Sequence, residues 1–220
     1  TQTICVKADS ANGAQGAKVY LRAEIDGDKI MAVCGAYMKR NGRLTGNTIV
    51  ATVMSNLGLH EFCRKNGIDL VCTNVGDRNV LEKMVECGYK LGGEQSGHMI
   101  FTDYATTGDG ELTAGKLLKL LAESGKKMSE LNGIYAQYPQ VLVNVVANAA
   151  QKAAYKADEV LAGFIENEQQ KLMGMGRVLV RVSGTEPKIR VMVEGEDMEA
   201  IQSSAERIAD MIRQRIPGVC

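Results

Sequence analysis

Apolar segments with helical spacing alternate with short strand-like apolar runs along the first part of this chain. This alternation constrains the fold most, because strands and helices that alternate through short connections form a sheet covered by helices. We predict an α/β domain over residues 24–135, three-layer-like and built on a mixed sheet. Helices are expected over residues 29–39, 59–66, 80–87 and 111–123, strands over 48–54 and 70–73, and a loop and strand over 89–101.

A smaller domain is predicted over residues 136–220, because the segment 123–137 carries the break between the two patterns. Strands are expected over 140–146, 178–182 and 189–193, and helices over 155–173 and 198–216. In the last helix, apolar side chains keep helical spacing on one face, at Ile201, Ala205, Ile208, Ala209 and Ile212. The pattern predicts an α+β domain whose last two strands form a hairpin.

The turn of this hairpin combines hydroxyl, glycine and arginine residues. Ser183 and Thr185 offer hydroxyls, and Gly184 lets backbone N–H groups approach an anion closely. Arg181 before the turn and Arg190 after it can each present the planar fork of donors that matches phosphate oxygens. The alternative is a surface hairpin whose arginines are merely solvated. The combination of residue types favours a phosphate-binding hairpin.

A second polar cluster lies in a glycine-rich segment, residues 92–98. Its glycines predict a loop that presents Glu94, Ser96 and His98 to solvent. In an extended segment these three side chains would point the same way. Glu94 can accept two hydrogen bonds, as vicinal sugar hydroxyls require, and His98 can shuttle protons near neutral pH. The alternative for His98 is a histidine that only braces the loop, and the sequence supports both readings equally.

These motifs resemble those of a known enzyme family. Residues 93–98, Gly-Glu-Gln-Ser-Gly-His, look like the sugar-binding loop of the α-D-phosphohexomutases, and residues 181–190 look like the phosphate-binding loop of their last domain. Residues 75–78, 106–110 and 139–145 fit the same family in the same order. The wording Glu-Gln-Ser-Gly-His, Val-Gly-Asp-Arg and Ser-Gly-Thr-Glu-Pro is similar to the phosphoglucosamine mutase branch. The resemblance runs from about Glu24 to the C-terminus.

The resemblance implies reversible transfer of a phosphoryl group between O6 and O1 of glucosamine phosphate, through a phosphoserine and a bisphosphorylated intermediate. In that scheme Glu94 and Ser96 grip the sugar hydroxyls, and His98 is the candidate catalytic proton shuttle. Asp77 and Arg78 complete the substrate pocket, although a helix cap or an ion pair explains this pair equally well. The non-reacting phosphate would be held by Arg181, Ser183, Gly184, Thr185 and Arg190.

Two parts of the family pattern have no counterpart in this sequence. Family members carry a phosphorylated serine and an aspartate-rich magnesium loop, so Mg²⁺ is expected for the full-length protein. Here Asp26-Gly27-Asp28 is followed by Lys29, and we interpret it as a turn and helix start, with no metal ligand predicted. Residues 1–23 resemble a remnant of the start of the family's second domain. We therefore expect the chain alone to bind a phosphosugar and to turn nothing over.

Composition agrees with a cytoplasmic enzyme or a piece of one. The chain has 26 Lys and Arg residues and 26 Asp and Glu residues. It therefore lacks the excess of positive charge that would indicate binding to nucleic acid or to a membrane surface. The six cysteines form no Cys-x-x-Cys pair, and Cys34, Cys63 and Cys87 are expected to act as small apolar residues. The expected ligand is a phosphorylated amino sugar, and the sequence is compatible with a homodimer. The alternatives are another hexose-phosphate mutase and a non-catalytic phosphosugar-binding module.

Overall fold

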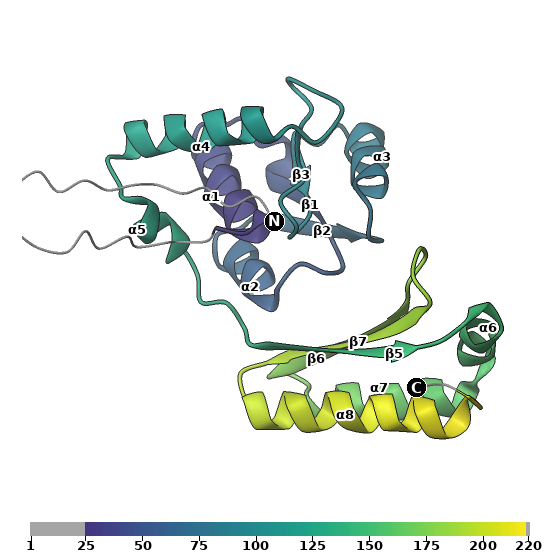
Figure 1. Cartoon of the computed structure of the whole chain (residues 1–220). Coiled ribbons are helices and arrows are strands. Elements are labelled where there is room, and N and C mark those ends of the chain that lie inside the picture. The colour runs from purple at the N-terminus through teal and green to yellow at the C-terminus, as the bar shows by residue number, and fades with distance from the viewer. Residues whose placement is uncertain (1–24, 219–220) are drawn as a thin grey trace, which may run out of the picture. The chain divides into compact units, whose positions relative to one another are not determined.

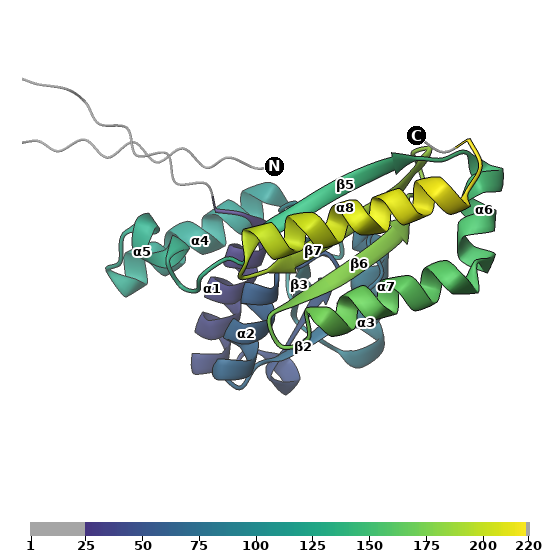
Figure 2. The same cartoon turned by 90° about the horizontal axis from the view of Figure 1, so that it is seen from below.

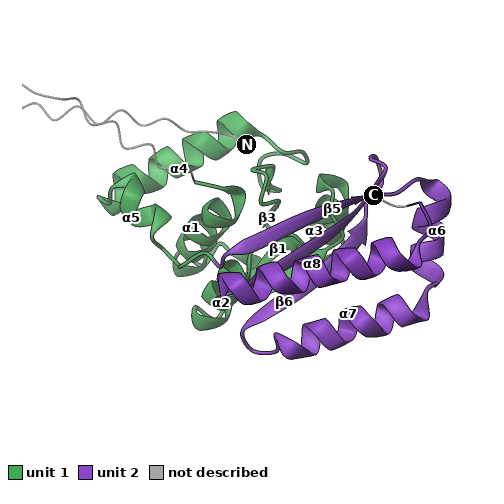
Figure 3. Cartoon of the chain, turned by 60° about the horizontal axis from the view of Figure 1, so that its bottom comes forward, with its two compact units in different colours: residues 1–137 green, residues 138–220 purple. Residues whose placement is uncertain are grey.

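The computed structural model describes residues 25–218, which form two compact units divided between Gln137 and Tyr138 (Figures 1 and 3). The predicted remnant at residues 1–23 lies outside the described residues. Each unit has its own hydrophobic core. The two units are therefore described separately.

The first unit is an α/β domain with a four-stranded mixed sheet. Its strands lie in the order β2-β1-β3-β4, with β1 parallel to both neighbours and β4 antiparallel to β3. The elements are α1 (Gly27–Arg40), the 3₁₀ turn η1 (Thr45–Asn47), β1 (Thr48–Thr52), α2 (Leu57–Lys65), β2 (Asp69–Thr73), α3 (Asp77–Cys87), β3 (Leu91–Gly93), β4 (Met99–Phe101), α4 (Gly110–Ser124) and α5 (Met128–Asn132).

Helices cover both faces of this sheet, which confirms the predicted three-layer arrangement (Figure 1). Helices α1 and α2 share one core with the strands, where Met31 and Leu59 meet Ile49. Helix α3 packs on the opposite face through Val80 and Met84. Helix α4 lies on α1 and forms a fourth, outer element.

Side-chain caps fix where three of these helices begin. Asp26 accepts a hydrogen bond of 2.9 Å from the backbone N–H of Lys29, which confirms that Asp26-Gly27-Asp28 is a helix start. Asn56 caps α2, which begins two residues earlier than expected. Asp109 caps α4, as the sequence predicted, because its Oδ1 accepts a hydrogen bond of 2.9 Å from the backbone N–H of Leu112.

The carboxyl ends of β1, β2 and β3 lie at one edge of the sheet, because these strands are parallel. The segments that follow them are residues 53–56, 74–76 and 94–98. In open α/β sheets, ligands bind outside the carboxyl ends of the strands. The glycine-rich segment is thus on the edge where a ligand is expected.

The second unit is a smaller α+β domain. Its antiparallel sheet has the order β5-β7-β6, and α7 and α8 pack against one of its faces (Figure 2). The predicted apolar stripe of α8 is confirmed, since all five of its residues are buried. The elements are β5 (Gln140–Val146), α6 (Ala149–Ala157), α7 (Glu159–Lys171), β6 (Gly176–Val182), β7 (Lys188–Gly195) and α8 (Met198–Arg215).

The single helix expected over residues 155–173 is wrong, because two helices occupy this region. Helix α6 begins after Asn148, which forms a reciprocal capping box with Gln151. Asp158 interrupts the helical path and caps α7, accepting at 3.0 Å from the N–H of Leu161. Arg215 of α8 donates to the same carboxylate at 2.8 Å, which holds the break in place.

Two further observations concern the sequence expectations. Of the four cysteines within residues 25–218, Cys34 and Cys63 are buried, whereas Cys72 and Cys87 are exposed. The expectation that Cys87 packs as a small apolar residue is therefore wrong. Over the same residues, none of the helices combines the length and apolar character needed to span a bilayer.

Candidate functional site

The glycine-rich turn, defined here as residues 94–98, joins β3 to β4. As the glycines predicted, it is a loop, and it is a tight turn and not an extended segment, because the chain must reverse for the two strands to pair. Glu94 N–H donates to the carbonyl of His98 at 3.0 Å, and Gly97 N–H donates back to the carbonyl of Glu94 at 3.0 Å. Gly97 has φ 104°, a conformation that favours glycine.

The turn nevertheless brings the three predicted polar side chains together. Ser96 Oγ lies 3.2 Å from Nδ1 of His98, and Oε2 of Glu94 lies 3.8 Å from the same nitrogen. The side chain of Glu94 is only 14% exposed, whereas that of His98 is 64% exposed. The turn thus offers a fixed carboxylate beside an accessible imidazole.

The backbone before α3 holds the carboxylate of Glu94. Gly76 N–H donates to Oε1 of Glu94 at 3.0 Å, which leaves Oε2 on the side of His98. This bond places Asp77 and Arg78, the next two residues, beside the glycine-rich turn. Asp77 Oδ1 accepts from the N–H of Arg78 at 2.8 Å. Arg78 lies along α3 in an exposed ion pair with Glu82, with 2.8 Å between Nε and Oε1.

Two glycines outside the turn lie against it, and one of them, Gly27, is required for its close packing. Gly27, at the start of α1, donates its N–H to the carbonyl of Gln95 at 2.9 Å. A β-carbon at Gly27 would collide with the carbonyl oxygen of Glu94. Gly108 lies against the ring of His98, but a β-carbon there would be at an ordinary contact distance, 3.6 Å from Cδ2. Sequence analysis did not single out Gly27 as a support, because its role depends on a contact about seventy residues away.

The arginine hairpin, defined here as residues 181–190, joins β6 to β7 through a five-residue loop. Ser183 is buried at the base, where its N–H donates to the carbonyl of Lys188 at 2.9 Å. Its Oγ accepts from the N–H of Glu186 at 3.1 Å, so this hydroxyl shapes the loop. Gly184 and Thr185 are exposed at the tip. A β-carbon on Gly184 would meet no atom within 4 Å, so the space beside its backbone is open.

Positive charge is concentrated in the arginine hairpin. Arg181 and Arg190 face each other directly across β6 and β7. Lys188 lies two residues from Arg190 on β7. Glu186 is the carboxylate of the hairpin, and it pairs with Lys188 at 2.8 Å and also with Arg190. Hydrogen bonds from Lys188 and Arg190 lower the pKa of the Glu186 carboxyl.

Sequence analysis missed two lysines at this hairpin. Lys152 of α6 donates to the carbonyl oxygens of Ser183 and Glu186, at 2.8 Å for the first, and ties the loop to the helix. Lys152 could not be recognised because α6 itself was placed incorrectly. Lys188 lies within the motif, and counting every cation of the hairpin would have found it.

The residues described do not supply a magnesium site. Asp26 caps α1, and Oδ2 of the buried Asp28 accepts a hydrogen bond of 2.7 Å from the N–H of Asn56. Within residues 25–218, no group of three or more His, Cys, Asp or Glu side chains is arranged to hold a metal ion. Mg²⁺ usually takes six oxygen ligands and retains several waters. The donor sets present here do not fit this ion.

Comparisons with known protein families and sequences give consistent matches. Residues 26–138 match the model described as phosphoglucomutase/phosphomannomutase, alpha/beta/alpha domain III, and residues 142–211 match the C-terminal domain of the same group. The phosphoglucosamine mutase of Caldicellulosiruptor saccharolyticus is 54% identical over 87% of this chain and 43% of its own length. That of Thermoanaerobacter pseudethanolicus is 52% identical over the same shares. The chain thus spans less than half the length of these relatives.

Solved structures show the same fold. N-acetylphosphoglucosamine mutase of Aspergillus fumigatus, in complex with GlcNAc-6P and magnesium, matches with a TM-score of 0.72 and 22% identity, over 88% of this chain and 48% of that one. A second structure of the A. fumigatus enzyme matches with a TM-score of 0.75 and 20% identity, over 90% and 45% of the two chains. At this level of identity the likeness concerns the fold alone.

Proposed function

The chain belongs to the phosphoglucomutase/phosphomannomutase family, and we propose that it forms the sugar- and phosphate-binding half of a phosphoglucosamine mutase. The relatives at 50–54% identity that carry this name support the branch. The complete protein would interconvert glucosamine 6-phosphate and glucosamine 1-phosphate. Because the chain covers 43% of those relatives, the reaction is proposed for the longer protein, and substrate binding for this chain.

The observation that carries the proposal is the arginine pair of the hairpin. Like charges directly opposite on neighbouring strands destabilise a sheet. Arg181 and Arg190 occupy such a pair, and Glu186 contacts Arg190 and Lys188. A phosphate dianion between the two guanidinium groups would remove the repulsion and form charge-assisted hydrogen bonds. The like-charged pair lowers the stability of the sheet, and a role in phosphate binding would explain why both arginines are present.

The remaining hairpin residues would complete a phosphate cradle. The open space beside Gly184 gives an anion access to backbone N–H groups. Thr185 is exposed and can donate its hydroxyl to a phosphate oxygen. Ser183 Oγ already accepts a hydrogen bond from the N–H of Glu186, so the hydroxyl proton of Ser183 is available to donate. In our proposal Arg181 and Arg190 supply the charge, and the loop supplies the neutral donors.

The glycine-rich turn would hold the sugar. Gly76 and α1 fix the turn, so Glu94 and Ser96 are oriented before a ligand arrives, which lowers the entropic cost of binding. Oε2 of Glu94 would accept a sugar hydroxyl, and Ser96 would donate or accept. The exposed imidazole of His98 can move a proton at the sugar oxygen that it reaches. Asp77 and Arg78 would lie at the edge of this pocket.

Magnesium belongs to the proposal only through the longer protein. The described residues offer no donor set for the ion, and no role of this chain depends on it. We expect the Mg²⁺ of the full-length enzyme, and the serine that carries the phosphoryl group, to be supplied by the part of the relatives that this chain does not match.

Calorimetric titration of this chain with glucosamine 6-phosphate tests the proposal. We expect saturable binding that Arg181→Gln weakens by roughly 10- to 100-fold, because a charge-assisted contact to phosphate is lost. The matched control is Arg213→Gln, since Arg213 lies on α8 in an exposed pair with Asp210. Equal effects of the two substitutions would contradict the phosphate assignment. Tighter binding of glucose or mannose 6-phosphate would favour another branch of the family.

A further inference from the structure

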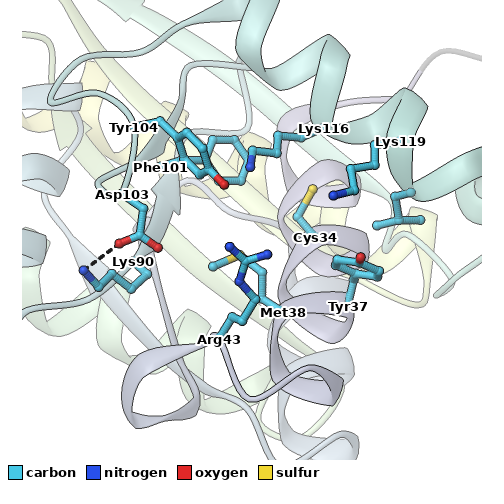
Figure 4. Close-up of a pocket in the computed structure, with 11 residues that line it drawn as sticks. Cys34, Tyr37, Met38, Arg43, Lys90, Phe101, Asp103, Tyr104, Lys116 and Lys119 are labelled. Atoms are coloured by element: carbon cyan, nitrogen blue, oxygen red, sulfur yellow. Dashed lines mark ion pairs between the residues drawn. The ribbon is translucent and has the colours of Figure 1, made fainter. Parts of the chain in front are cut away.

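A cavity lies in the first unit, between α1 and α4 (Figure 4). The space it encloses is about 50 Å³, and the rest of it is open to solvent. Lys90 and Phe101, at one end of the β3–β4 hairpin, line it, whereas the glycine-rich turn is at the other end of the same hairpin. The cavity is therefore separate from the proposed sugar site.

The inner surface of this cavity is apolar. Cys34, Phe101 and Leu120 form its floor, and each is less than 10% exposed. Two tyrosine rings, Tyr37 from α1 and Tyr104 from the segment after β4, stand at its sides (Figure 4). A flat, apolar chemical group could displace water from such a surface and contact the rings.

The rim of the cavity is strongly positive. Four of the residues that line it are cations, Arg43, Lys90, Lys116 and Lys119, against the single carboxylate of Asp103. Two of these charges are balanced locally. Lys90 pairs with Asp103 at 2.7 Å, and Lys119 lies 3.6 Å from the carboxylate of Glu123.

The other two cations, Arg43 and Lys116, form no ion pair with a carboxylate among the described residues. The ammonium of Lys116 lies 3.4 Å from the centre of the Tyr104 ring, a cation–π contact that holds it at the rim. Its hydrogen bond, with a smaller one from Arg43, lowers the pKa of the Tyr104 hydroxyl. Both cations point toward the cavity (Figure 4).

We propose that this cavity binds a small organic anion with an aromatic body. Its ring would lie on Phe101 and Leu120 between the two tyrosines, and its anionic group would meet Arg43 and Lys116. Charge complementarity selects the anion, because Lys90 and Lys119 are balanced by carboxylates, whereas Arg43 and Lys116 lack a carboxylate partner in the described part of the chain. The apolar floor favours a ligand with an aromatic ring, because a fully hydrated inorganic ion would leave the floor uncovered.

An NMR titration of the ¹⁵N-labelled chain with 2-naphthoate tests this site. We expect saturable shifts of the amides of Phe101, Tyr104 and Lys116, with the turn at 94–98 unaffected. The neutral analogue 2-naphthylmethanol should bind about tenfold more weakly, since it cannot form the charge-assisted contacts. Inorganic phosphate, which lacks a ring, should not shift these amides.

A double substitution, Arg43→Gln with Lys116→Gln, is expected to lower the affinity for 2-naphthoate by at least about tenfold. Both side chains are at the rim, so the fold is expected to persist, and the unchanged spectrum of the second unit checks this. Lys83→Gln, at a partly exposed position on α3, is the matched control. Absence of saturable shifts at the cavity, equal binding of the neutral alcohol, or unchanged affinity of the double variant would overturn the proposal.

Discussion

The glycine-rich turn and the arginine hairpin are both β-hairpin turns, yet they are held in different ways. In the first, the carboxylate of Glu94 is largely buried and is bound by the backbone of Gly76, while α1 contacts the turn through Gly27. In the second, Gly184 and Thr185 stand in open space, and Glu186 holds two of the cations.

The glycine-rich turn is therefore characterised by its fixed shape, and the arginine hairpin by its charge. The glycine-rich turn is part of the packing of its unit, so its geometry exists before a ligand arrives and depends on the fold. The arginine hairpin adds repulsion to a sheet that the α7–α8 layer already stabilises. Substitutions should therefore damage stability in the first region and affinity in the second.

The largest expected effect is that of Gly27→Ala on the first unit. The new β-carbon would collide with the carbonyl of Glu94 and lie 2.9 Å from the amide nitrogen of Gly97. Because both neighbours are backbone atoms, the turn or α1 must move, and we expect a loss of about 3 kcal/mol of unfolding free energy. Hydrogen exchange of the β1 amides measures it.

Gly115→Ala is the control for this substitution. Gly115 lies within α4, and a β-carbon there meets no atom within 4 Å. Alanine should stabilise the helix by about 0.5–1 kcal/mol. If Gly27→Ala behaved like Gly115→Ala, the turn would not depend on close packing, and the contrast between the two regions would disappear.

The next effect concerns Glu168, a buried carboxylate of the second unit that is not in the arginine hairpin. It accepts hydrogen bonds from Lys171 at 2.6 Å, Ser204 at 2.8 Å and Arg207 at 2.6 Å, and so joins α7 to α8. Burial raises the pKa of Glu168, but the hydrogen bonds from Arg207, Lys171 and Ser204 outweigh it and lower the pKa to about 2. This charge stabilises the fold, unlike those of the hairpin.

Glu168→Gln should lower the unfolding free energy of the second unit by about 2–3 kcal/mol at pH 7, because buried donors lose their charged acceptor. A pKa depressed in the folded state gives stability that is complete above the ordinary value of 4.5 and is lost as pH falls toward 2. The difference between wild type and variant should therefore shrink below pH 4.5 in exchange of the α8 amides. A difference that stays constant across this pH range would contradict the assigned charge network. The control is Glu166→Gln, an exposed position on α7, which should leave the unfolding free energy unchanged.

Patterns of local spacing predicted most of this fold. The apolar stripe of α8 and the alternating elements of the first unit gave the layers, because burial of one face requires that periodicity. The break at Asp158 was missed, since a cap within a continuous helical pattern is a weak signal until Arg215 is known to bind it. The short helix α5 carried no periodic signal at all.

The sequence predicted which polar side chains come together at the candidate site, but it did not predict the residues that support them. Glu94, Ser96 and His98 were found because their types and glycine neighbours are local in the sequence, although they meet in a turn and not in an extended strand. Gly27, Gly76 and Lys152 were missed as supports because each acts through a backbone contact distant in sequence. Such contacts depend on tertiary packing, which single-sequence patterns do not encode.

A smaller effect is expected for Arg181→Gln on the stability of the second unit. Removing one member of a like-charged cross-strand pair should leave the unfolding free energy unchanged or raise it by up to about 0.5 kcal/mol. Guanidinium chloride would mask the electrostatic effect, so urea unfolding at low salt is the measurement. A loss of more than about 1 kcal/mol would mean that Arg181 supports the fold, and the hairpin would then resemble the Glu168 network.

The smallest effect, and the sharpest test of the comparison, is Gly184→Ala. The added β-carbon has open space and φ at this position is not positive, so we expect a change in stability within about 0.5 kcal/mol. The same methyl group would stand where an anion approaches the backbone, so the affinity for glucosamine 6-phosphate should fall about three- to tenfold. Gly163→Ala in α7, also in open space, should leave affinity unchanged. Should Gly184→Ala bind as tightly as wild type, the loop backbone would take no part in phosphate binding, and Arg181 and Arg190 alone would carry it.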